Sequence, residues 1–582
     1  MNIENGRIKA REMSLIFYDF EVFKYDWLIC ACDPIERKWT VIDNNKVGLE
    51  LFYEQHKEDI WVGYNSRSYD TYILKAILLG FDPKDVNDWI IQTGKKGWEY
   101  SSEFNSIQLY NYDVMPSKGY GLKTLEGFMG NDMRESSVPF NINRKLTDEE
   151  MKETIKYCKH DVEQTMAVFI RNKADFDAHL SMIKTFHLPM KSISRTQAQL
   201  SAMAIGCVRK DWFDEWEYSI VDTLRIEKYK DVYEWFIDQK SFRDYNATLN
   251  VDVCGVPHLF GWGGLHGAPA EPVHRKGLLL HVDVTSFYPS IMIHYDMLSR
   301  NVEDKNVYKQ IYETRVALKK AGKKREQAPY KIILNATYGI SKDKYSNAFD
   351  PRRANEVCVN GQLLLLDLLE HLEGHCELIQ SNTDGLIIQI PDTDEAFNTV
   401  DDICYEWESR TGMKLGFDII TEIWQKDVNN YIFRFDSGKL ERKGGYVKEL
   451  NELDNDLPII NTALVDAMTR NIPVEQTIMQ CNDLKQFQKV VKVSSKYHCG
   501  WHNGKHLQEK TFRVFASTDE NDTFIGKMKW KKTNELAVEK FANTPEHCFI
   551  YNDSVNGKKV PNKLDKRWYI ELAQKRLKQF GI

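Results

Sequence analysis

Apolar and polar residues are arranged along the chain in patterns that predict both strands and helices. Residues 14–23 (SLIFYDFEVF) are rich in aromatic and β-branched residues, which favours a strand. Residues 61–80 predict a short strand, a polar turn and a helix. Residues 146–169 predict a longer helix, because Thr147 and Glu150 have the spacing of an N-terminal capping box. The patterns therefore predict a mixed α/β and α+β protein.

Acidic side chains occur at regular spacings within these N-terminal elements. Asp19 and Glu21 are two residues apart on the predicted strand and thus share one face. Their mutual repulsion raises a pKa unless a cation neutralises them. Tyr157 and Asp161 are four apart on the predicted helix and also share a face, whereas Asp70 lies near a helix start. Taken singly, the strand pair could be a solvated face and Asp70 a helix cap.

A strand that ends in a carboxylate marks the middle of the chain. Residues 277–290 (GLLLHVDVTSFYPS) predict an apolar strand that reaches Asp283 and breaks at Thr285-Ser286 into a helix. A charged group at the end of a buried strand is costly unless a cation meets it. A divalent metal ion is the partner that this pattern favours.

A second carboxylate follows about a hundred residues later, in a predicted hairpin. Residues 377–390 (ELIQSNTDGLIIQI) form two apolar runs around Asp384-Gly385, a strong turn signal. This arrangement places Asp384 at the hairpin tip. A further strand pair is predicted around Ser437-Gly438 within residues 429–447.

Two basic helical segments separate these carboxylates. Arg315 and Lys319 are four residues apart and predict one cationic helix face suited to a triphosphate. Residues 329–339 predict the beginning of a second helix, on which Lys331 and Asn335 share a polar stripe. Considered alone, the first segment could equally be a solvated basic helix.

Composition narrows the class of protein. A chain of 582 residues is too long for one core, and it has no apolar window long enough to span a bilayer. The polar N-terminus lacks the apolar core of a signal peptide, so we expect a cytoplasmic protein. Eleven scattered cysteines fit buried reduced thiols rather than a disulfide framework or a CxxC metal module. The net charge is −7, but residues 485–582 contain twenty Lys or Arg against ten Asp or Glu, which favours phosphate binding there.

Taken together, these motifs resemble the family B DNA polymerases, most closely those of bacteriophages. Motif A is matched by Asp283, Ser286, Phe287, Tyr288, Pro289 and Ser290, and motif B by Lys331, Asn335, Tyr338 and Gly339. Motif C is matched by Asp384, with Asn382 where the family usually has aspartate. The three exonuclease motifs are matched by Asp19 and Glu21, by Asn65, Tyr69 and Asp70, and by Tyr157 and Asp161.

The resemblance implies two reaction centres, each with two Mg²⁺ ions, or with Mn²⁺ in their place. The polymerase metals would be held by Asp283, Asp384 and the backbone of Val284. The exonuclease metals would be held by Asp19, Glu21, Asp70 and Asp161, with Tyr157 orienting the attacking water. The incoming nucleotide would contact Ser286, Phe287, Tyr288, Arg315, Lys319, Lys331 and Asn335. The DNA would contact Tyr338, Gly339, Tyr431 and Lys443.

The resemblance also implies a domain order. A ribonuclease H-like exonuclease domain is expected over residues 1–180 and a helical linker over 181–270. The palm, fingers and thumb of a right-hand polymerase are expected over the remainder: 271–300 and 356–450 for the palm, 301–355 for the fingers and 451–582 for the thumb. A glycine-rich stretch at residues 261–268 could contact single-stranded template or be an irregular interdomain loop.

The expected partners are primer-template DNA and deoxynucleoside triphosphates, bound by a monomer without a membrane. Only 48 positions separate Asp283 from Lys331, which leaves no room for the strand-displacement insertion of protein-primed relatives. We therefore expect extension of nucleic-acid primers, supported by a helicase, a single-stranded DNA-binding protein or a clamp-like factor, in phage genome replication.

Two other functions remain open at this point. One is a nuclease whose polymerase half has decayed, suggested by Asn382 and Gly385. The other is a noncatalytic DNA-binding replication component, in which all the acidic residues would be structural. Primer extension by a variant lacking the exonuclease distinguishes the first from a polymerase, and the absence of any turnover would mark the second.

Overall fold

The chain forms two compact units in the computed structural model, which describes residues 3–4, 7–8, 13–116, 118–531 and 535–582. The first unit comprises Met1–Arg195, Leu450–Pro458 and Cys481–Trp568, and the second comprises Thr196–Glu449, Ile459–Gln480 and Tyr569–Ile582. Both contain helices and strands, so the prediction of a multidomain mixed α/β protein is confirmed. The segment 451–582, expected as one thumb, is divided between the two units, and the division passes through α16 (Lys566–Lys578).

A mixed five-stranded sheet organises the N-terminal part of the first unit, in the order β5-β4-β3-β6-β7. Its strands are β3 (Leu15–Val22), β4 (Trp27–Asp33), β5 (Lys38–Asp43), β6 (Ile60–Gly63) and β7 (Tyr110–Asp113). The first three pair antiparallel, whereas β6 and β7 run parallel to β3. Its helices are α1 (Lys46–His56), α2 (Asp70–Leu79), α3 (Pro83–Ile91), α4 (Leu122–Met129), α5 (Asp148–Arg171) and α6 (Lys173–Thr185).

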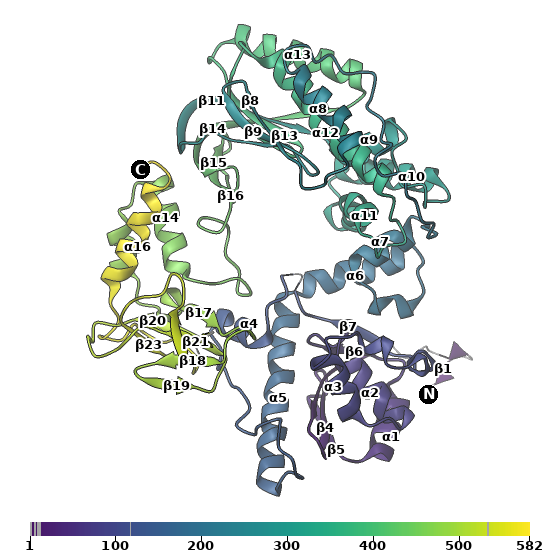
Figure 1. Ribbon diagram of the computed structural model, residues 1–582, viewed down its shortest axis with the longest axis vertical. Helices are drawn as coiled ribbons and strands as arrows, with labels where there is room; N and C mark the ends of the chain where they lie inside the picture. The colour runs from purple at the N-terminus through teal and green to yellow at the C-terminus, as the bar shows by residue number, and fades with distance from the viewer. Residues whose placement is uncertain (1–2, 5–6, 9–12, 117, 532–534) are drawn as a thin grey trace. The chain divides into compact units, whose positions relative to one another are not determined.

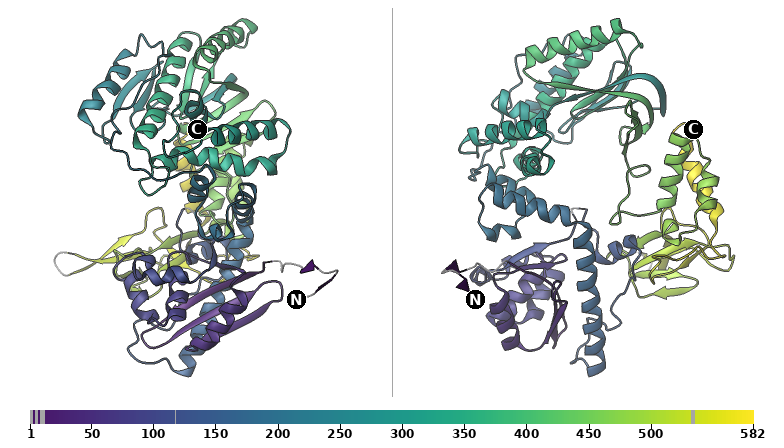
Figure 2. Two further views of the ribbon diagram at one scale, coloured as in Figure 1. Left: turned by 90° about the vertical axis from the view of Figure 1, so that its right-hand side faces the viewer. Right: turned by 180° about the vertical axis from the view of Figure 1, so that it is seen from behind.

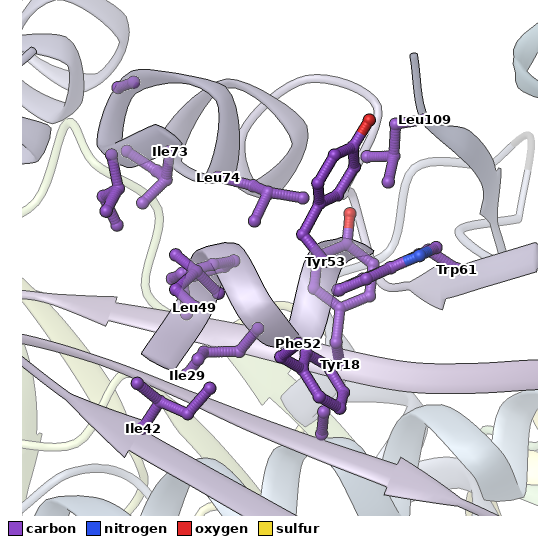
Figure 3. Close-up of a cluster of buried hydrophobic side chains, with 14 of the residues drawn as sticks. Tyr18, Ile29, Ile42, Leu49, Phe52, Tyr53, Trp61, Ile73, Leu74 and Leu109 are labelled. Carbon is purple, nitrogen blue, oxygen red and sulfur yellow. The ribbon is translucent and has the colours of Figure 1, made fainter. Parts of the chain in front are cut away.

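Side chains of β3 alternate between two buried environments. Tyr18 and Phe20 belong to a core formed with α1 and α2 (Figure 3). Tyr18 meets the Trp61 ring edge-to-face, with ring centroids 5.2 Å apart, and its hydroxyl donates to Asn111 over 2.9 Å. Phe17 lies on the other face, against Phe169 of α5. Because strand side chains alternate, Asp19 and Glu21 share the face covered by α5.

The helix α5 begins as the sequence predicts. Thr147 and Glu150 form a reciprocal capping box, in which each side chain accepts a hydrogen bond from the other residue's backbone N–H. Glu150 also accepts two hydrogen bonds from Arg144, over 2.7 and 2.8 Å. This arrangement satisfies N–H groups that a helix start otherwise leaves unpaired, and it fixes the register of the helix.

Two further sheets complete the first unit. One has the order β17-β20-β23, with strands β17 (Lys489–Lys492), β20 (Thr511–Ala516) and β23 (Cys548–Ile550). The other has the order β19-β18-β21-β22, with strands β18 (Cys499–His502), β19 (Lys505–Leu507), β21 (Gly526–Trp530) and β22 (Leu536–Lys540). The fully buried Arg513 of β20 donates to the carbonyls of Gly127 and Asn131, over 3.1 and 2.8 Å, and thereby joins the end of α4 to these strands.

A nine-stranded antiparallel sheet forms the centre of the second unit, in the order β16-β15-β14-β11-β13-β12-β10-β9-β8. Its strands are β8 (Leu249–Val253), β9 (Val256–Phe260), β10 (His266–Gly267), β11 (Val273–Val284), β12 (Glu377–Asn382), β13 (Gly385–Gln389), β14 (Leu415–Asp427), β15 (Asn430–Phe435) and β16 (Leu440–Lys443). Helices α12 (Pro351–Leu372) and α13 (Asp394–Thr411) lie along this sheet (Figures 1 and 2). In α12 the four consecutive leucines 363–366 are fully buried.

Residues 181–270 are not only helical, contrary to the expectation of a helical linker. They include α7 (Gln197–Ala204) and α8 (Lys230–Phe242), but also β8, β9 and β10, which extend the central sheet. The strand signal is an alternation of buried and exposed positions, with Val256, His258 and Phe260 buried between exposed neighbours. Pairing of β10 with β12, of β9 with β10 and of β8 with β9 then overrides any preference of these residues for a helix.

Helices α9 (Phe287–His294), α10 (Lys305–Lys320) and α11 (Lys324–Lys342) follow β11 in the second unit. The second basic helix was expected to begin near Pro329, but α11 begins five residues earlier and contains this proline. A proline inside a helix costs one backbone hydrogen bond. Pro329 is buried, and its packing offsets part of that loss. Helices α14 (Pro458–Arg470) and α15 (Val474–Gln480) lie later in the chain.

All eleven cysteines are free thiols, of which six are buried and five are partly buried. Among the described residues, no helix combines the length and the apolar character that crossing a lipid bilayer requires.

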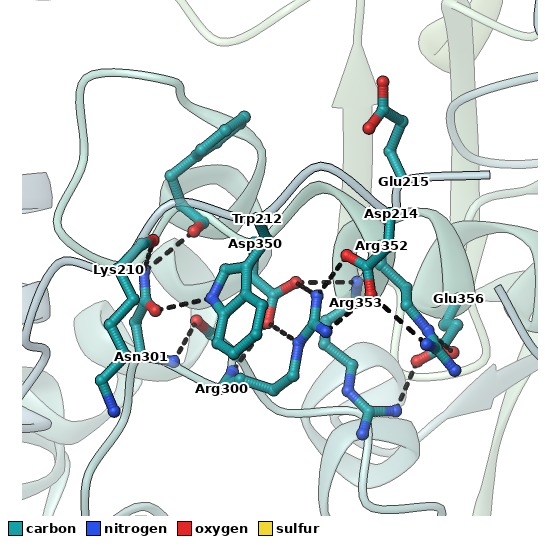
Figure 4. Close-up of polar contacts among 12 residues, drawn as sticks. Lys210, Trp212, Asp214, Glu215, Arg300, Asn301, Asp350, Arg352, Arg353 and Glu356 are labelled. Atoms are coloured by element: carbon teal, nitrogen blue, oxygen red, sulfur yellow. Dashed lines mark hydrogen bonds and ion pairs between the residues drawn. The ribbon is translucent and has the colours of Figure 1, made fainter. Parts of the chain in front are cut away.

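A network of ion pairs holds the segment before α8 against the start of α12 (Figure 4). The Arg300 guanidinium donates two hydrogen bonds to Asp214, over 2.7 and 2.8 Å, and others to the fully buried Asp350, the shortest over 2.7 Å. It also stacks 3.9 Å from the Trp212 ring centre. The hydrogen bonds from Arg300, together with the nearby Arg352, lower the pKa of Asp214 to about 2.

We expect Arg300→Ala to lower the free energy of unfolding by about 3–5 kcal/mol, because it leaves the buried Asp350 without its cation. Chemical denaturation measures this loss. The control is Arg275→Ala, which removes an exposed ion pair with Glu377 of 3.2 Å and should cost about 0–1 kcal/mol. Equal losses in the two variants would show that the network does not stabilise the fold.

Candidate active sites

Strand pairing brings Asp283 and Asp384 together, although they lie about a hundred residues apart in the sequence. Asp283 pairs with Gly385 across β11 and β13, and the backbone N–H of Val284 donates to the Asp384 carbonyl over 2.7 Å. The two carboxylates, hereafter the central carboxylate pair, influence each other electrostatically. The hairpin prediction placed Asp384 correctly at the tip, but the turn residues are Thr383 and Asp384, and Gly385 already begins β13.

Close backbone approach explains the glycines around this turn. A Cβ on Gly385 would lie 3.0 Å from the Val282 carbonyl oxygen and 3.4 Å from the Asp283 carboxylate. A Cβ on Gly264 would lie 2.3 Å from Thr383 Oγ1, and the Thr383 N–H donates to the Leu265 carbonyl over 2.7 Å. The glycine-rich stretch 261–268 therefore supports the turn that presents Asp384.

A cavity of about 240 Å³ opens over the central carboxylate pair. Its other polar lining residues are His281, Gln380, Asn382, Tyr431, Glu441 and Lys443. Burial, followed by repulsion from Asp384, raises the pKa of Asp283 to about 7. Burial also raises the pKa of Asp384, although a hydrogen bond from its own backbone N–H and the charge of the nearby Lys443 act in the opposite direction. The central carboxylate pair thus carries negative charge that the protein does not fully neutralise.

A second cavity, of about 280 Å³, lies beside the end of β11 and is cationic. It is lined by Thr285, Ser286, Arg315, Val316, Lys319 and Lys320. Arg315 donates a hydrogen bond to the Ser286 hydroxyl, and its Nε has no hydrogen-bond partner among the described residues. The charge of Lys319 lowers the pKa of Asp283, so this lysine acts on both cavities. Guanidinium and ammonium groups at a cavity of this kind suit a polyphosphate.

The remaining residues expected at the nucleotide lie at different places. Lys331 and Asn335 are exposed on α11 and do not line the cationic cavity. Phe287 is only 3% exposed and belongs to the hydrophobic core. The rings of Tyr288 and Tyr338 meet edge-on, with centroids 4.7 Å apart, and thus connect α9 to α11.

The residues expected at the DNA are grouped in part. Tyr431 and Lys443 face each other across β15 and β16, and the Lys443 ammonium lies 5.7 Å from the Tyr431 ring centre. Both line the cavity over the central carboxylate pair. Gly339, in contrast, is exposed on α11.

A separate group of acids lies under α5 in the first unit. We call Asp19, Glu21, Asp70 and Asp161 the N-terminal carboxylate cluster. Asp70 accepts a hydrogen bond from the Phe20 N–H over 3.1 Å, which fixes the start of α2 beside β3. Burial and the neighbouring carboxylates raise the pKa of Asp19 and Glu21 well above the usual range, and burial raises that of Asp70 to about 7. Such crowded acids are typical of a site for divalent cations.

The expected tyrosine lies beside this cluster, together with a lysine that the sequence patterns did not reveal. The Lys123 ammonium bonds to Asp161 and to Glu126, the latter over 3.1 Å, and lies 4.7 Å from the Tyr157 ring centre. Burial lowers the pKa of Lys123, but the two carboxylates outweigh burial and raise it. Burial and Asp161 raise the pKa of Tyr157, so its hydroxyl remains a hydrogen-bond donor.

Sequence reasoning missed several residues at both places. Lys123, Glu126 and His160 lie beside Asp161, whereas His281, Gln380 and Glu441 line the central cavity. His160 directly precedes Asp161 in the sequence, and His281 lies two residues before Asp283 on one strand face. These short spacings could have indicated His160 and His281 from the sequence. Lys123, Glu126, Gln380 and Glu441 lie on other elements, and only the folded chain shows that they are neighbours.

Both groups of acids fit divalent cations. Carboxylate oxygens are the ligands that Mg²⁺ prefers, and a bound cation would relieve the repulsion that raises these pKa values. The central carboxylate pair and the N-terminal carboxylate cluster therefore match the expected Mg²⁺ ligands in chemistry.

Without metal ions, the protein should lose stability as the pH rises from about 5 to about 8. Asp70 and Asp283 have folded-state pKa values of about 7, above the roughly 3.9 of an unfolded aspartate. The folded state therefore binds more protons in this window, and its free energy of unfolding falls as these protons are lost. We expect a loss of about 1–2 kcal/mol.

Thermal melts in EDTA at pH 5.5 and pH 8 measure this effect. Asp283→Asn should reduce the difference between the two melts, and added Mg²⁺ should restore stability at pH 8. The matched control is Asp436→Asn, which changes an exposed aspartate after β15 of the same sheet. A difference unchanged by Asp283→Asn would contradict the assignment.

Comparisons with known proteins give a weak structural likeness. No family model matches the chain, and no curated protein matches its sequence. The structure of the family B DNA polymerase from the hyperthermophilic archaeon Pyrobaculum calidifontis aligns with 99% of this chain and 78% of its own, with 13% sequence identity and a TM-score of 0.43. At this TM-score the function has to be argued from the side chains.

Proposed function

We propose that the protein is a DNA-dependent DNA polymerase of the family B type with a 3′–5′ proofreading exonuclease, acting in phage genome replication. The observation that carries the proposal is the juxtaposition of Asp283 and Asp384 in a cavity next to the cationic cavity of Arg315 and Lys319. Paired carboxylates beside a polyphosphate site are what two-metal nucleotidyl transfer needs.

In this proposal each cavity has one role. The central carboxylate pair would hold two Mg²⁺ ions, which activate the primer 3′ hydroxyl and neutralise the departing pyrophosphate when they are bound. Arg315 and Lys319 would bind the triphosphate and stabilise the charge that develops on it. Tyr431 and Lys443 would hold the primer end at the rim of the central cavity.

The N-terminal carboxylate cluster supports the editing activity. Its four acids, with Tyr157 beside them, would hold the ions that activate water against the terminal phosphodiester. The sheet order with three antiparallel strands followed by two parallel ones supports a ribonuclease H-like exonuclease domain over residues 1–180. The palm would then be the nine-stranded sheet, and α10 and α11 the fingers.

Primer extension on a template, with and without deoxynucleoside triphosphates, tests the proposal. Growth of the primer with nucleotides and its shortening without them would support both activities. Shortening alone would support a nuclease with a decayed polymerase half, and metal-independent binding without turnover would support a noncatalytic replication component.

Tyr288 should exclude ribonucleotides from the polymerase site. Its ring is held between Tyr338 and the backbone of Gly361, where a Cβ would lie 3.0 Å from the ring, so it cannot yield to a 2′ hydroxyl. We expect Tyr288→Ala to raise ribonucleotide relative to deoxynucleotide incorporation about tenfold to a hundredfold, the range that one steric contact supplies.

Single-nucleotide incorporation assays give this ratio. Tyr288→Phe is the control, because it keeps the ring and should keep the discrimination. An unchanged ratio in Tyr288→Ala would contradict the role assigned to this residue.

A further inference from the structure

A buried group of potential metal ligands adjoins the N-terminal carboxylate cluster. Glu126 of α4 and His160 and Asp161 of α5 bring one ligand atom each to within 4.8 Å of one another. Glu126 is fully buried and His160 is 7% exposed. The proposed exonuclease uses only Asp161 of these three.

Two of these side chains have unsatisfied polar atoms that face each other. Glu126 Oε2 and His160 Nε2 lie 3.6 Å apart, and neither has a hydrogen-bond partner among the described residues. This separation is too long for a hydrogen bond. It is close to the roughly 3.4 Å that separates two ligand atoms bound to one tetrahedral ion at about 2.1 Å. Buried polar atoms without partners are rare, and an ion between them would satisfy both.

A protein cation already occupies the acidic side of this group. The Lys123 ammonium bonds to the other oxygen of Glu126, over 3.1 Å, and to Asp161. It neutralises one of the two negative charges, whereas His160 Nε2 has no hydrogen-bond partner among the described residues. The group thus holds one cation on its oxygens and leaves an imidazole nitrogen unused.

We propose that Glu126, His160 and Asp161 form a binding site for a transition-metal dication of the Zn²⁺ class. The imidazole ligand favours Zn²⁺, Cu²⁺ or Ni²⁺ over Mg²⁺, which prefers an all-oxygen shell. The ion and the Lys123 ammonium compete for the same carboxylates, so binding of the ion displaces Lys123 from Asp161.

The competition between the ion and Lys123 affects the N-terminal carboxylate cluster, because Asp161 belongs to both the site and the cluster. When the ion binds, it replaces the Lys123 ammonium as the cation next to Asp161. Any effect on strand cleavage rests on the proposed exonuclease, whereas the binding itself depends only on the three ligands. Binding measurements therefore test the site separately from the activity.

The experiment is equilibrium dialysis of the full chain against micromolar Zn²⁺ with millimolar Mg²⁺, followed by metal analysis. Mg²⁺ fills the all-oxygen sites, and we expect about one retained Zn²⁺ per chain. Glu126→Gln and His160→Gln should each weaken this retention at least about tenfold. Lys123→Met removes the competing cation and should strengthen it about tenfold or more.

Two controls locate the ion. Asp19→Asn and Cys158→Ser alter the adjacent group of Asp19, Glu21 and Cys158 and should leave the retained Zn²⁺ unchanged. Loss of Zn²⁺ in Cys158→Ser, or full retention in both His160→Gln and Glu126→Gln, would overturn the proposal. Circular dichroism melts check that each variant is folded. The gain expected for Lys123→Met cannot result from unfolding, and its absence would also count against the site.

Discussion

Asp384→Asn should abolish primer extension, with a loss of at least about a thousandfold in kcat/KM, while strand shortening continues. The substitution keeps the size of the side chain but removes the negative charge of one member of the central carboxylate pair. Asn382, which lines the same cavity, is neutral and cannot replace the negative charge that Asp384 loses. Steady-state incorporation of a single nucleotide measures the loss.

The control for this variant is Asp392→Asn, an exposed aspartate shortly after the end of β13. It should extend primers at the unaltered rate. Extension by Asp384→Asn at a rate near that of the unaltered protein would remove the central carboxylate pair from the mechanism.

Asp19→Asn should abolish strand shortening by at least about a thousandfold and leave primer extension intact. Asp19 lies on β3 beside three other carboxylates, and burial together with these carboxylates raises its pKa. An ionised Asp19 is therefore unfavourable in this position unless cations bind there, and those cations are what the cleavage reaction requires. Release of labelled nucleotides from a single-stranded 3′ end measures this activity.

The matched control is Asp43→Asn, an exposed aspartate on β5 of the same sheet, which should cleave normally. If Asp19→Asn also lost primer extension, the two groups of acids would not serve separate reactions. Continued cleavage by Asp19→Asn would place the nuclease activity elsewhere in the chain.

Local patterns in the sequence predicted those elements whose signals lie within one segment. The strand around Asp19, the capped helix that carries Asp161 and the hairpin at Asp384 all depend on neighbouring residues, and the structure contains each of them. The juxtaposition of Asp283 and Asp384 was implied by the resemblance of their segments to motifs A and C, because no local pattern connects a strand end with a hairpin tip a hundred residues later.

Features that depend on pairing between distant segments could not be predicted in the same way. Strands β8–β10 are short, and they are determined by pairing rather than by composition: β10 pairs with the β12 edge, β9 with β10 and β8 with β9. Lys123 meets Asp161 across 38 residues of sequence, and no spacing rule connects them. Lys331, in contrast, matched a motif but is exposed on α11 and does not line the cationic cavity.

The buried Arg513 has a consequence for how the first unit could be divided. Its guanidinium has carbonyl oxygens and the Gln488 amide as its partners, and three of those carbonyls belong to α4 or the residues just after it. A fragment ending near residue 195 would lack Arg513. The backbone carbonyls at the C-terminal end of α4, the helix that carries Lys123, would then lose their hydrogen-bond donor. The N-terminal carboxylate cluster and the strands near the C-terminus therefore belong to one structural unit, and neither could be transferred to another protein without the other.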